Sequence, residues 1–246
     1  MRVLVISDIH ANLAAFEAVL KDAQTRAAYD MVWCLGDVVG YGPDPNECID
    51  LLLTLPHVCL SGNHDWAVLE KLDIQTFHAQ AAHIARWTRE VLRPRNLIFL
   101  QARPEKLAHG EYLLVHASPR EPIWEYITDT TIAEENFEFF DETFCLCGHT
   151  HVPAIFVRDD KTGHVRLSLP APGVAVKLKA DARYIINPGG VGQPRDGDPR
   201  AAYAILDTET RIFTVYRAEY DYQATQNKMR EAGFPQRMID RLAFGR

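Results

Sequence analysis

Short apolar runs alternate with polar clusters along the first 150 residues of the chain. Five of these runs have the composition of buried strands, and each is followed by a cluster that contains His, Asp or Asn. The runs cover residues 3–6, 31–35, 58–60, 112–115 and 144–147. The clusters are Asp8-Ile9-His10, Gly36-Asp37, Gly62-Asn63-His64-Asp65, His116 and Gly148-His149-Thr150-His151. Because open α/β sheets build their sites at strand ends, this pattern predicts one metal site assembled from five distant segments.

Helical spacing of apolar residues separates the first strands. It predicts one helix over residues 11–23 and a second helix around residues 46–53, with Asn46 as its N-cap. The resulting β-α-β-α-β order favours strands joined by crossover helices. A further helix is predicted from about Ile74 to Leu92, and Pro94 is expected to stop it.

The second half of the chain is richer in strands. They are expected at residues 105–107, 112–115, 144–147, 154–158, 164–169, 184–186, 202–206 and 211–216, with helices near 223–231 and 236–242. Two such halves predict an α+β fold, an αββα sandwich of two mixed sheets flanked by helices. Residues 1–246 are expected to form one domain, with the metal motifs in 8–151 and the C-terminal strands and helices in 184–246. The Gly- and Pro-punctuated segment 159–183 is expected to be a mobile hairpin near the site.

Composition and charge limit the classes of function. A net charge of −7 gives no basic field for a nucleic acid or a membrane surface, and no apolar run approaches the ~18 residues of a membrane span. The five cysteines contain no C-x-x-C pair, so they are expected to be reduced and buried. Together with an opening strand in place of a signal peptide, they predict a cytoplasmic protein.

The spacing within the clusters suits metal binding. Asp8 and His10 are two residues apart, as are His149 and His151, and alternate residues of an extended chain share a face. A set of N and O donors without thiolates suits ions such as Mn²⁺, Fe²⁺ or Zn²⁺. Seven candidate ligands exceed the need of one ion and suffice for two ions that share a bridging carboxylate.

The clusters resemble the motifs of the calcineurin-like metallophosphoesterases, which read D-x-H, G-D, G-N-H-[DE], H and G-H-x-H. All five stand in this order across residues 8–151. The resemblance implies the αββα sandwich and two divalent metal ions, with Mn expected and Fe, Zn, Ni or Co as alternatives. The implied ligands are Asp8, His10 and His151 for the first ion, Asn63, His116 and His149 for the second, and Asp37 as the bridge.

The same resemblance assigns catalytic roles to the third cluster. His64 matches the family's catalytic histidine, which assists the leaving group while a metal-bound hydroxide attacks phosphorus. Asp65 either orients His64 or begins a helix. Arg195, Asn12 and Arg120 are the expected substrate contacts, with a plain surface position as the alternative for Arg195. Trp87 and Trp124 are expected to pack in the fold, with a groove-lining role as the alternative.

Longer stretches resemble the small bacterial and archaeal phosphodiesterase branch of this family. They are residues 8–13, 36–42, 116–120 and 187–195. Protein serine/threonine phosphatases of the superfamily carry an Arg soon after the bridging Asp, whereas residues 39–42 here contain no cation. Because a monoester carries more negative charge than a diester, this absence favours phosphodiesters. A second departure is Ala117, where many relatives have Gly.

The resemblance therefore implies a phosphoesterase acting on a small-molecule or nucleotide phosphoester, most readily a phosphodiester. The alternative is a phosphomonoesterase or a nucleotide or phosphoprotein phosphatase. A non-catalytic scaffold, such as the retromer subunit that shares this fold, predicts eroded motifs, and none is eroded here. No membrane contact and no clear nucleic-acid surface are expected, and a homo-oligomer is left open.

Overall fold

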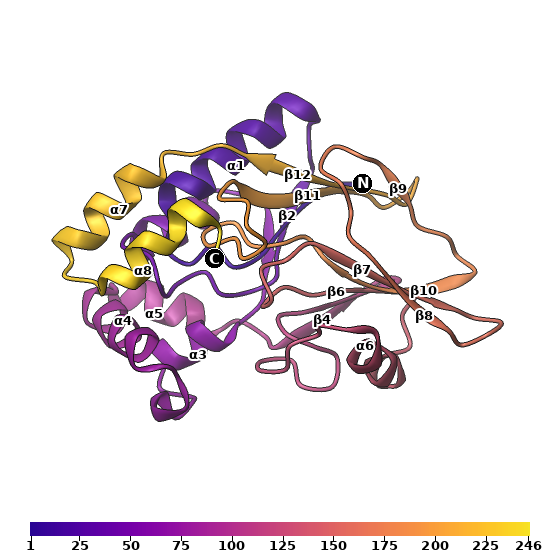
Figure 1. Ribbon diagram of the computed structural model, residues 1–246, viewed down its shortest axis with the longest axis horizontal. Helices are drawn as coiled ribbons and strands as arrows, with labels where there is room; N and C mark the ends of the chain where they lie inside the picture. The colour runs from indigo at the N-terminus through magenta and orange to yellow at the C-terminus, as the bar shows by residue number, and fades with distance from the viewer.

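Two six-stranded mixed sheets lie face to face in the computed structural model, which describes residues 1–246, and helices cover their outer faces (Figure 1). The predicted αββα sandwich is confirmed. No helix combines the length and the apolar character that a membrane span requires. All five cysteines are buried and unpaired, as expected.

The first sheet is built around the opening strand. In spatial order its strands are β3 (His57–Cys59), β2 (Met31–Cys34), β1 (Arg2–Ile6), β11 (Ala201–Asp207), β12 (Ile212–Ala218) and β9 (Val176–Lys177). Side chains of β1 alternate between two cores: Leu4 and Ile6 pack under the helices, and Val3 and Val5 face the other sheet. Helices α1 (Leu13–Arg26) and α2 (Pro45–Leu53) are crossovers between the parallel strands β1, β2 and β3.

The second sheet holds the later clusters. Its strands in spatial order are β4 (Lys106–His109), β5 (Tyr112–Val115), β6 (Phe144–Leu146), β10 (Ala182–Asn187), β7 (Ala154–Asp159) and β8 (Val165–Ser168). Tyr112, Phe144 and Ile186 pack against Trp33 and Phe213 of the first sheet, which closes the core between the sheets. Its outer face is covered by α6 (Thr130–Asn136) and the 3-10 helix η2 (Phe137–Phe139).

The prediction of one helix from Ile74 to Leu92 is wrong. A 3-10 helix, η1 (Ile74–Thr76), ends at the extended residue Phe77, and His78 then caps α4 (Ala79–Val91) by accepting the N–H of Gln80. Pro94 does more than stop a helix, because it opens α5 (Pro94–Gln101) at a position where no N–H is needed. Apolar spacing alone does not reveal such a break.

Two other local predictions need correction. The N-cap of α2 is Asp44, because Pro45 takes the first helical position, and the Asn46 amide instead joins Val91 and Arg93. Of the segment 159–183, the turn between β7 and β8 lies away from the site, whereas β8 runs back beside β7. Strand β7 runs away from its site end, where Ala154 pairs with Asn187, so the β7–β8 turn lies at the far end of the sheet.

The C-terminal segment forms a cap over one end of the first sheet. It consists of α7 (Tyr222–Glu231), α8 (Gln236–Asp240) and the 3-10 helix η3 (Arg241–Phe244). Met229, Phe234 and Met238 pack on Ile84 of α4, and Trp87 packs edge-on against Phe234. Figure 1 shows the yellow cap beside α4, with the C-terminus near the middle of the molecule. The cap thus closes one side of the region where the five clusters meet.

Candidate metal centre

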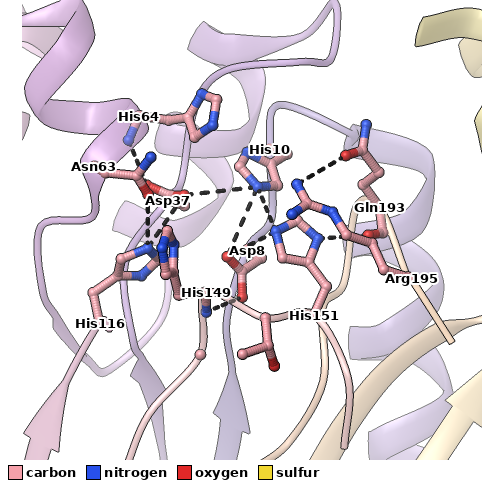
Figure 2. Close-up of polar contacts among 12 residues, drawn as sticks. Asp8, His10, Asp37, Asn63, His64, His116, His149, His151, Gln193 and Arg195 are labelled. Carbon is pink, nitrogen blue, oxygen red and sulfur yellow. Dashed lines mark hydrogen bonds and ion pairs between the residues drawn. The ribbon is translucent and has the colours of Figure 1, made fainter. Parts of the chain in front are cut away.

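The five clusters meet where strand ends of both sheets converge, and they form two groups of acidic and histidine side chains (Figure 2). In the first group, of Asp8, His10 and His151, the Nε2 of His151 lies 3.2 Å from Asp8 Oδ1. In the second group, of Asp37, His116 and His149, the Nε2 of His116 lies 3.3 Å from Asp37 Oδ2. Within each group the ligand atoms lie within 4.8 Å of one another, so each group can hold a metal ion.

The two groups are adjacent, and Asp37 lies between them. Its Oδ2 is 3.7 Å from His10 Nε2 of the first group, as well as near His116 of the second. The Oδ1 of Asn63 lies 3.1 Å from His116 Nε2, which adds a neutral oxygen on the side of the second group. The seven expected ligands therefore lie together, with Asp8, His10 and His151 in one group and His116 and His149 in the other.

The loops that carry these side chains have unusual backbone angles. Seven of the nine non-glycine residues with positive φ lie in them: Asp8, His10, Ala11, Asp37, Tyr41, His149 and His151. Each such residue costs on the order of 1–3 kcal/mol, which the surrounding fold must offset. A Cβ at Gly62 would collide with the Asp37 carboxylate, and one at Gly148 would collide with Ser7. The glycines of the motifs therefore permit the close approach of the loops.

Asp65 supports the backbone and makes no hydrogen bond to the His64 ring. Its carboxylate accepts hydrogen bonds from the N–H groups of Asp37 (2.9 Å), Val39 (3.2 Å) and Gly62 (3.0 Å). It also lies in the first turn of α3 (Asn63–Val68). These contacts match the helix-start alternative, and through them Asp65 fixes the loop of Asp37. The orienting role stays a prediction.

Backbone carbonyls fix the histidine rings. The Nδ1 atoms of His10, His116 and His151 face the carbonyl oxygens of Val39 (3.1 Å), Leu35 (2.9 Å) and Gln193 (2.5 Å). When the proton is on Nδ1, the lone pair of Nε2 is available to bind a metal ion. Metal-binding histidines commonly bond to a carbonyl oxygen in this way. His149 is turned the other way, because its Nε2 faces the carbonyl oxygen of Trp124 at 3.2 Å.

Burial sets the charges of the site. It lowers the pKa values of His10, His149 and His151 well below the usual range, which keeps these imidazoles in the neutral form that ligates metals. Burial raises the pKa of Asp8 to about 6. Burial alone would also raise the pKa of Asp37, but the neighbouring His116 and His64 outweigh it and lower that pKa.

The electrostatic balance of the site favours a cation. Burial lowers the pKa of His116, but the Asp37 carboxylate has the larger effect and raises that pKa to about 9. The site therefore favours a protonated, positively charged ring although the ring is buried. Asp8 Oδ1 and Asp37 Oδ2 are fully buried, and the groups that face them are the ring nitrogens of neighbouring histidines. Buried carboxylate oxygens require compensation, and divalent cations at the two groups would supply it. The residues present therefore fit a metal centre.

His64 lies beside the metal centre without joining either group. Its ring is 4.9 Å from that of His10 and 4.3 Å from that of Tyr41, and its buried Nδ1 has no hydrogen-bond partner. Burial lowers the pKa of His64 to about 4. A neutral imidazole with an unused polar atom is thus available at the edge of the site.

An aromatic wall borders the second group, and the sequence indicated only its Trp124. Tyr126 stacks on His149 with ring centroids 3.8 Å apart, and Phe77 packs at 5.0 Å from Trp124 and 5.1 Å from His64. Trp124 and Tyr126 remain 41% and 45% exposed. The groove-lining alternative therefore describes Trp124, whereas Trp87 packs in the fold as expected.

The three expected substrate contacts differ in their surroundings. Arg195 lies next to the first group, with its guanidinium 5.7 Å from the centroid of the Tyr41 ring (Figure 2). Asn12 is buried and caps α1, and its amide bonds to Gly192 and Thr225. The guanidinium of Arg120 is paired with Glu125 and Glu135. The side chains of Asn12 and Arg120 are thus held by other protein groups, and their substrate role stays a prediction.

Comparisons with known proteins agree with this geometry. Residues 1–211 match the family described as the calcineurin-like phosphoesterase superfamily domain. An uncharacterised protein of Methanocaldococcus jannaschii is 37% identical over 249 residues, covering 99% of this chain and 98% of its own. A metallophosphoesterase crystal structure from Sphaerobacter thermophilus is 46% identical with a TM-score of 0.90, over 100% of this chain and 99% of that one.

A more distant relative has a named activity. The symmetrical bis(5'-nucleosyl)-tetraphosphatase of Vibrio cholerae is 28% identical over 137 residues, which is 53% of this chain and 49% of the relative. The strand-end motifs, the two-sheet fold and the match over residues 1–211 lead to one conclusion. The chain belongs to the calcineurin-like phosphoesterase superfamily.

Proposed function

We propose that this phosphoesterase holds two divalent metal ions and preferentially hydrolyses phosphodiesters. The observation that carries the proposal is the pair of adjacent Asp and His groups with Asp37 between them. Asp8, His10 and His151 are the proposed ligands of one ion, Asn63, His116 and His149 those of the other, and Asp37 contributes to both. Manganese suits the mixed N and O donors, and Fe, Zn, Ni or Co are alternatives.

The protein contributes position and charge to the reaction. When bound, the two ions would make hydroxide available near neutral pH and neutralise the phosphoryl oxygens. The backbone contacts of Asp65 and of the histidine Nδ1 atoms keep the donor atoms in place before substrate arrives. Such preorganisation avoids rearrangement in the transition state.

His64 is the proposed aid to the leaving group. Burial lowers the pKa of His64 to about 4, so its imidazole is neutral near pH 7 and can donate an N–H hydrogen bond to a departing oxygen. Such assistance contributes roughly 10²–10⁴-fold to turnover. The proximity of His64 to His10 supports this role, because the leaving oxygen must stand close to the metal centre.

The preference for diesters follows from the supply of positive charge. Residues 39–42 contain no cation, and the Tyr41 ring faces His64 from this segment. The ions and Arg195 are then the main partners of the phosphoryl oxygens. A diester brings one negative charge and a monoester brings up to two, so the diester is the better match. The name of the Vibrio cholerae relative supports a nucleotide as the organic part.

The proposal is tested by measuring kcat/KM for bis(p-nitrophenyl) phosphate and p-nitrophenyl phosphate with Mn, Fe, Zn, Ni or Co. We expect the diester to have the higher value, and we expect chelation to remove both activities. Metal content determined on the same samples should approach two ions per chain. A clear preference for the monoester would support the alternative, a phosphomonoesterase. Absence of hydrolysis with every metal would refute the enzymatic proposal.

A further inference from the structure

The aromatic wall of Phe77, Trp124 and Tyr126 leaves large apolar rings open beside a charged site. Trp124 and Tyr126 are 41% and 45% exposed, and Phe77 is half-buried. The proposed hydrolysis at the metal centre uses none of these rings. Apolar side chains that stay exposed next to a polar site commonly bind an apolar part of a ligand. The wall therefore offers a contact for the organic part of a substrate.

The wall is continuous with the proposed aid to the leaving group. The Phe77 ring packs edge-on against His64 with centroids 5.1 Å apart, and it lies 5.0 Å from the Trp124 ring. At the other end, Tyr126 stacks on His149 at 3.8 Å, with an angle of 29° between the ring planes. An ester group that extends from the phosphoryl group past His64 therefore meets aromatic rings.

The main chain of the wall is fixed relative to the second metal group. The carbonyl oxygen of Trp124 faces His149 Nε2 at 3.2 Å, so the segment that carries Trp124 and Tyr126 is tied to a proposed metal ligand. Glu125, which lies between the two aromatic residues, accepts a hydrogen bond from the Ser118 hydroxyl at 2.7 Å. A ligand that binds to rings held in this way loses little free energy to their ordering.

The charge and the unused polar atom of this region define what it can bind. Burial raises the pKa of the Tyr126 hydroxyl, so all three side chains of the wall are neutral near pH 7. The buried Nδ1 of His64 has no hydrogen-bond partner in the protein, and such an atom is usually satisfied by a ligand or by water. The wall thus matches a neutral ring, and His64 matches the oxygen that joins the ring to phosphorus.

We propose that Phe77, Trp124 and Tyr126 bind an aromatic ring in one ester group of the substrate, so that the enzyme selects aryl over alkyl ester groups. This inference rests on the proposed phosphodiesterase function and adds a specificity determinant to it. Because Phe77 packs directly on His64, the ring must be attached close to the ester oxygen. Aromatic rings attract one another in offset-stacked and edge-on arrangements, which a saturated ring of similar size cannot reproduce.

The test compares two ligands that differ in the planarity of one ring. Phenylphosphonate and cyclohexylphosphonate have the same number of ring carbons, and each ring is joined to phosphorus by a carbon–phosphorus bond that ester hydrolysis does not cleave. Calorimetric titration of the metal-loaded protein measures both affinities. We expect the wild type to bind phenylphosphonate about 2–12-fold more tightly, the range for an aromatic pair. Trp124→Ala should lower this ratio to about one, and Trp124→Phe should restore most of it.

Two further variants protect the interpretation. Phe77→Leu should lower the same ratio, which keeps the inference testable if Trp124→Ala fails to fold. Phe139→Ala is the matched control, because Phe139 is 51% exposed on η2, where its ring faces the Arg120 guanidinium at 5.8 Å, and it should preserve the ratio.

Two outcomes would overturn the inference. One is a wild type without preference for phenylphosphonate, whether both compounds bind equally or neither binds. The other is an unchanged ratio in both Trp124→Ala and Phe77→Leu. Hydrolysis of bis(p-nitrophenyl) phosphate by the wild type separately tests the phosphodiesterase proposal.

Discussion

The candidate metal centre and the cavity beside the C-terminal cap both border Tyr41, yet they differ in which parts of the fold form them. The candidate metal centre consists of buried side chains at strand ends, and three of its histidine rings donate hydrogen bonds to backbone carbonyl oxygens. A cavity of about 570 Å³ beside Tyr41 is lined mainly by the C-terminal cap, and the guanidinium groups of Arg237 and Arg241 are among its lining. The contrast supports a division in which strand ends of the two sheets carry the candidate metal ligands and the C-terminal cap borders the approach to them.

The strongest way to break the metal centre is Asp37→Ala. Because Asp37 lies between the two groups, we expect loss of bound metal and a fall of hydrolysis to background. Mutation of a residue that only bonds to a metal ligand lowers metal affinity or activity roughly 10–100-fold, and mutation of a shared ligand should lower them further. Metal analysis after dialysis and a diester assay measure both effects. Two ions per chain in this variant would show that Asp37 is not a shared ligand.

His64→Ala should separate catalysis from metal binding. The His64 ring belongs to neither metal group, so metal content should stay at the wild-type level. Turnover should fall by roughly 10²–10⁴-fold, most for substrates with poor leaving groups. The readouts are metal content and kcat across a series of aryl diesters. Metal loss as severe as that of Asp37→Ala would make His64 a ligand instead.

Arg195→Ala tests the boundary between the two regions. We expect kcat/KM for the diester to fall about 10–150-fold, because a hydrogen bond to a charged phosphoryl oxygen is lost. Metal content should not change, since Arg195 is a cation and cannot ligate the ions. Steady-state kinetics together with metal analysis provide the measurement. Unchanged kinetics would assign Arg195 to the plain surface.

Asp65→Asn distinguishes support of the backbone from orientation of His64. The carboxylate accepts three main-chain hydrogen bonds around Asp37 and makes none to His64. We therefore expect metal affinity to fall about 10–100-fold, with kcat largely restored at saturating metal. Activity titrated against Mn²⁺ gives both quantities. A lower kcat with unchanged metal affinity would instead favour orientation of His64.

Arg120→Ala should have the smallest effect. Arg120 is 30% exposed and paired with two glutamates, and exposed ion pairs contribute little to stability. We expect activity to change less than about twofold and the melting temperature to fall by no more than about 4 °C. Kinetics and thermal unfolding provide the test. A tenfold loss of activity would restore Arg120 as a substrate contact.

The sequence predicts the metal centre better than its surroundings for a physical reason. Asp8, Asp37 and His116 each follow an apolar strand directly, so local pattern is enough to bring them to one edge. The hydrogen-bond partners of Asp65 depend on how its loop packs on the loop of Asp37. The sequence alone therefore left both roles open, orientation of His64 and the start of a helix. Arg241 lies beside Tyr41 only through the packing of the C-terminal cap on α4, which no local pattern encodes. The extended residue Phe77 likewise interrupts a spacing that still resembles a helix.

Each metal group draws its side chains from both sheets, and this has a consequence for biosynthesis. His10 and His151 are 141 residues apart in the chain. At a translation rate of roughly 5–20 residues per second, His151 is synthesised on the order of 10 s after His10. Strand β1 waits longer still for β11, its antiparallel neighbour. A nascent chain shorter than about 150 residues therefore lacks both complete ligand groups, so neither group can hold an ion in its complete form before that length is reached.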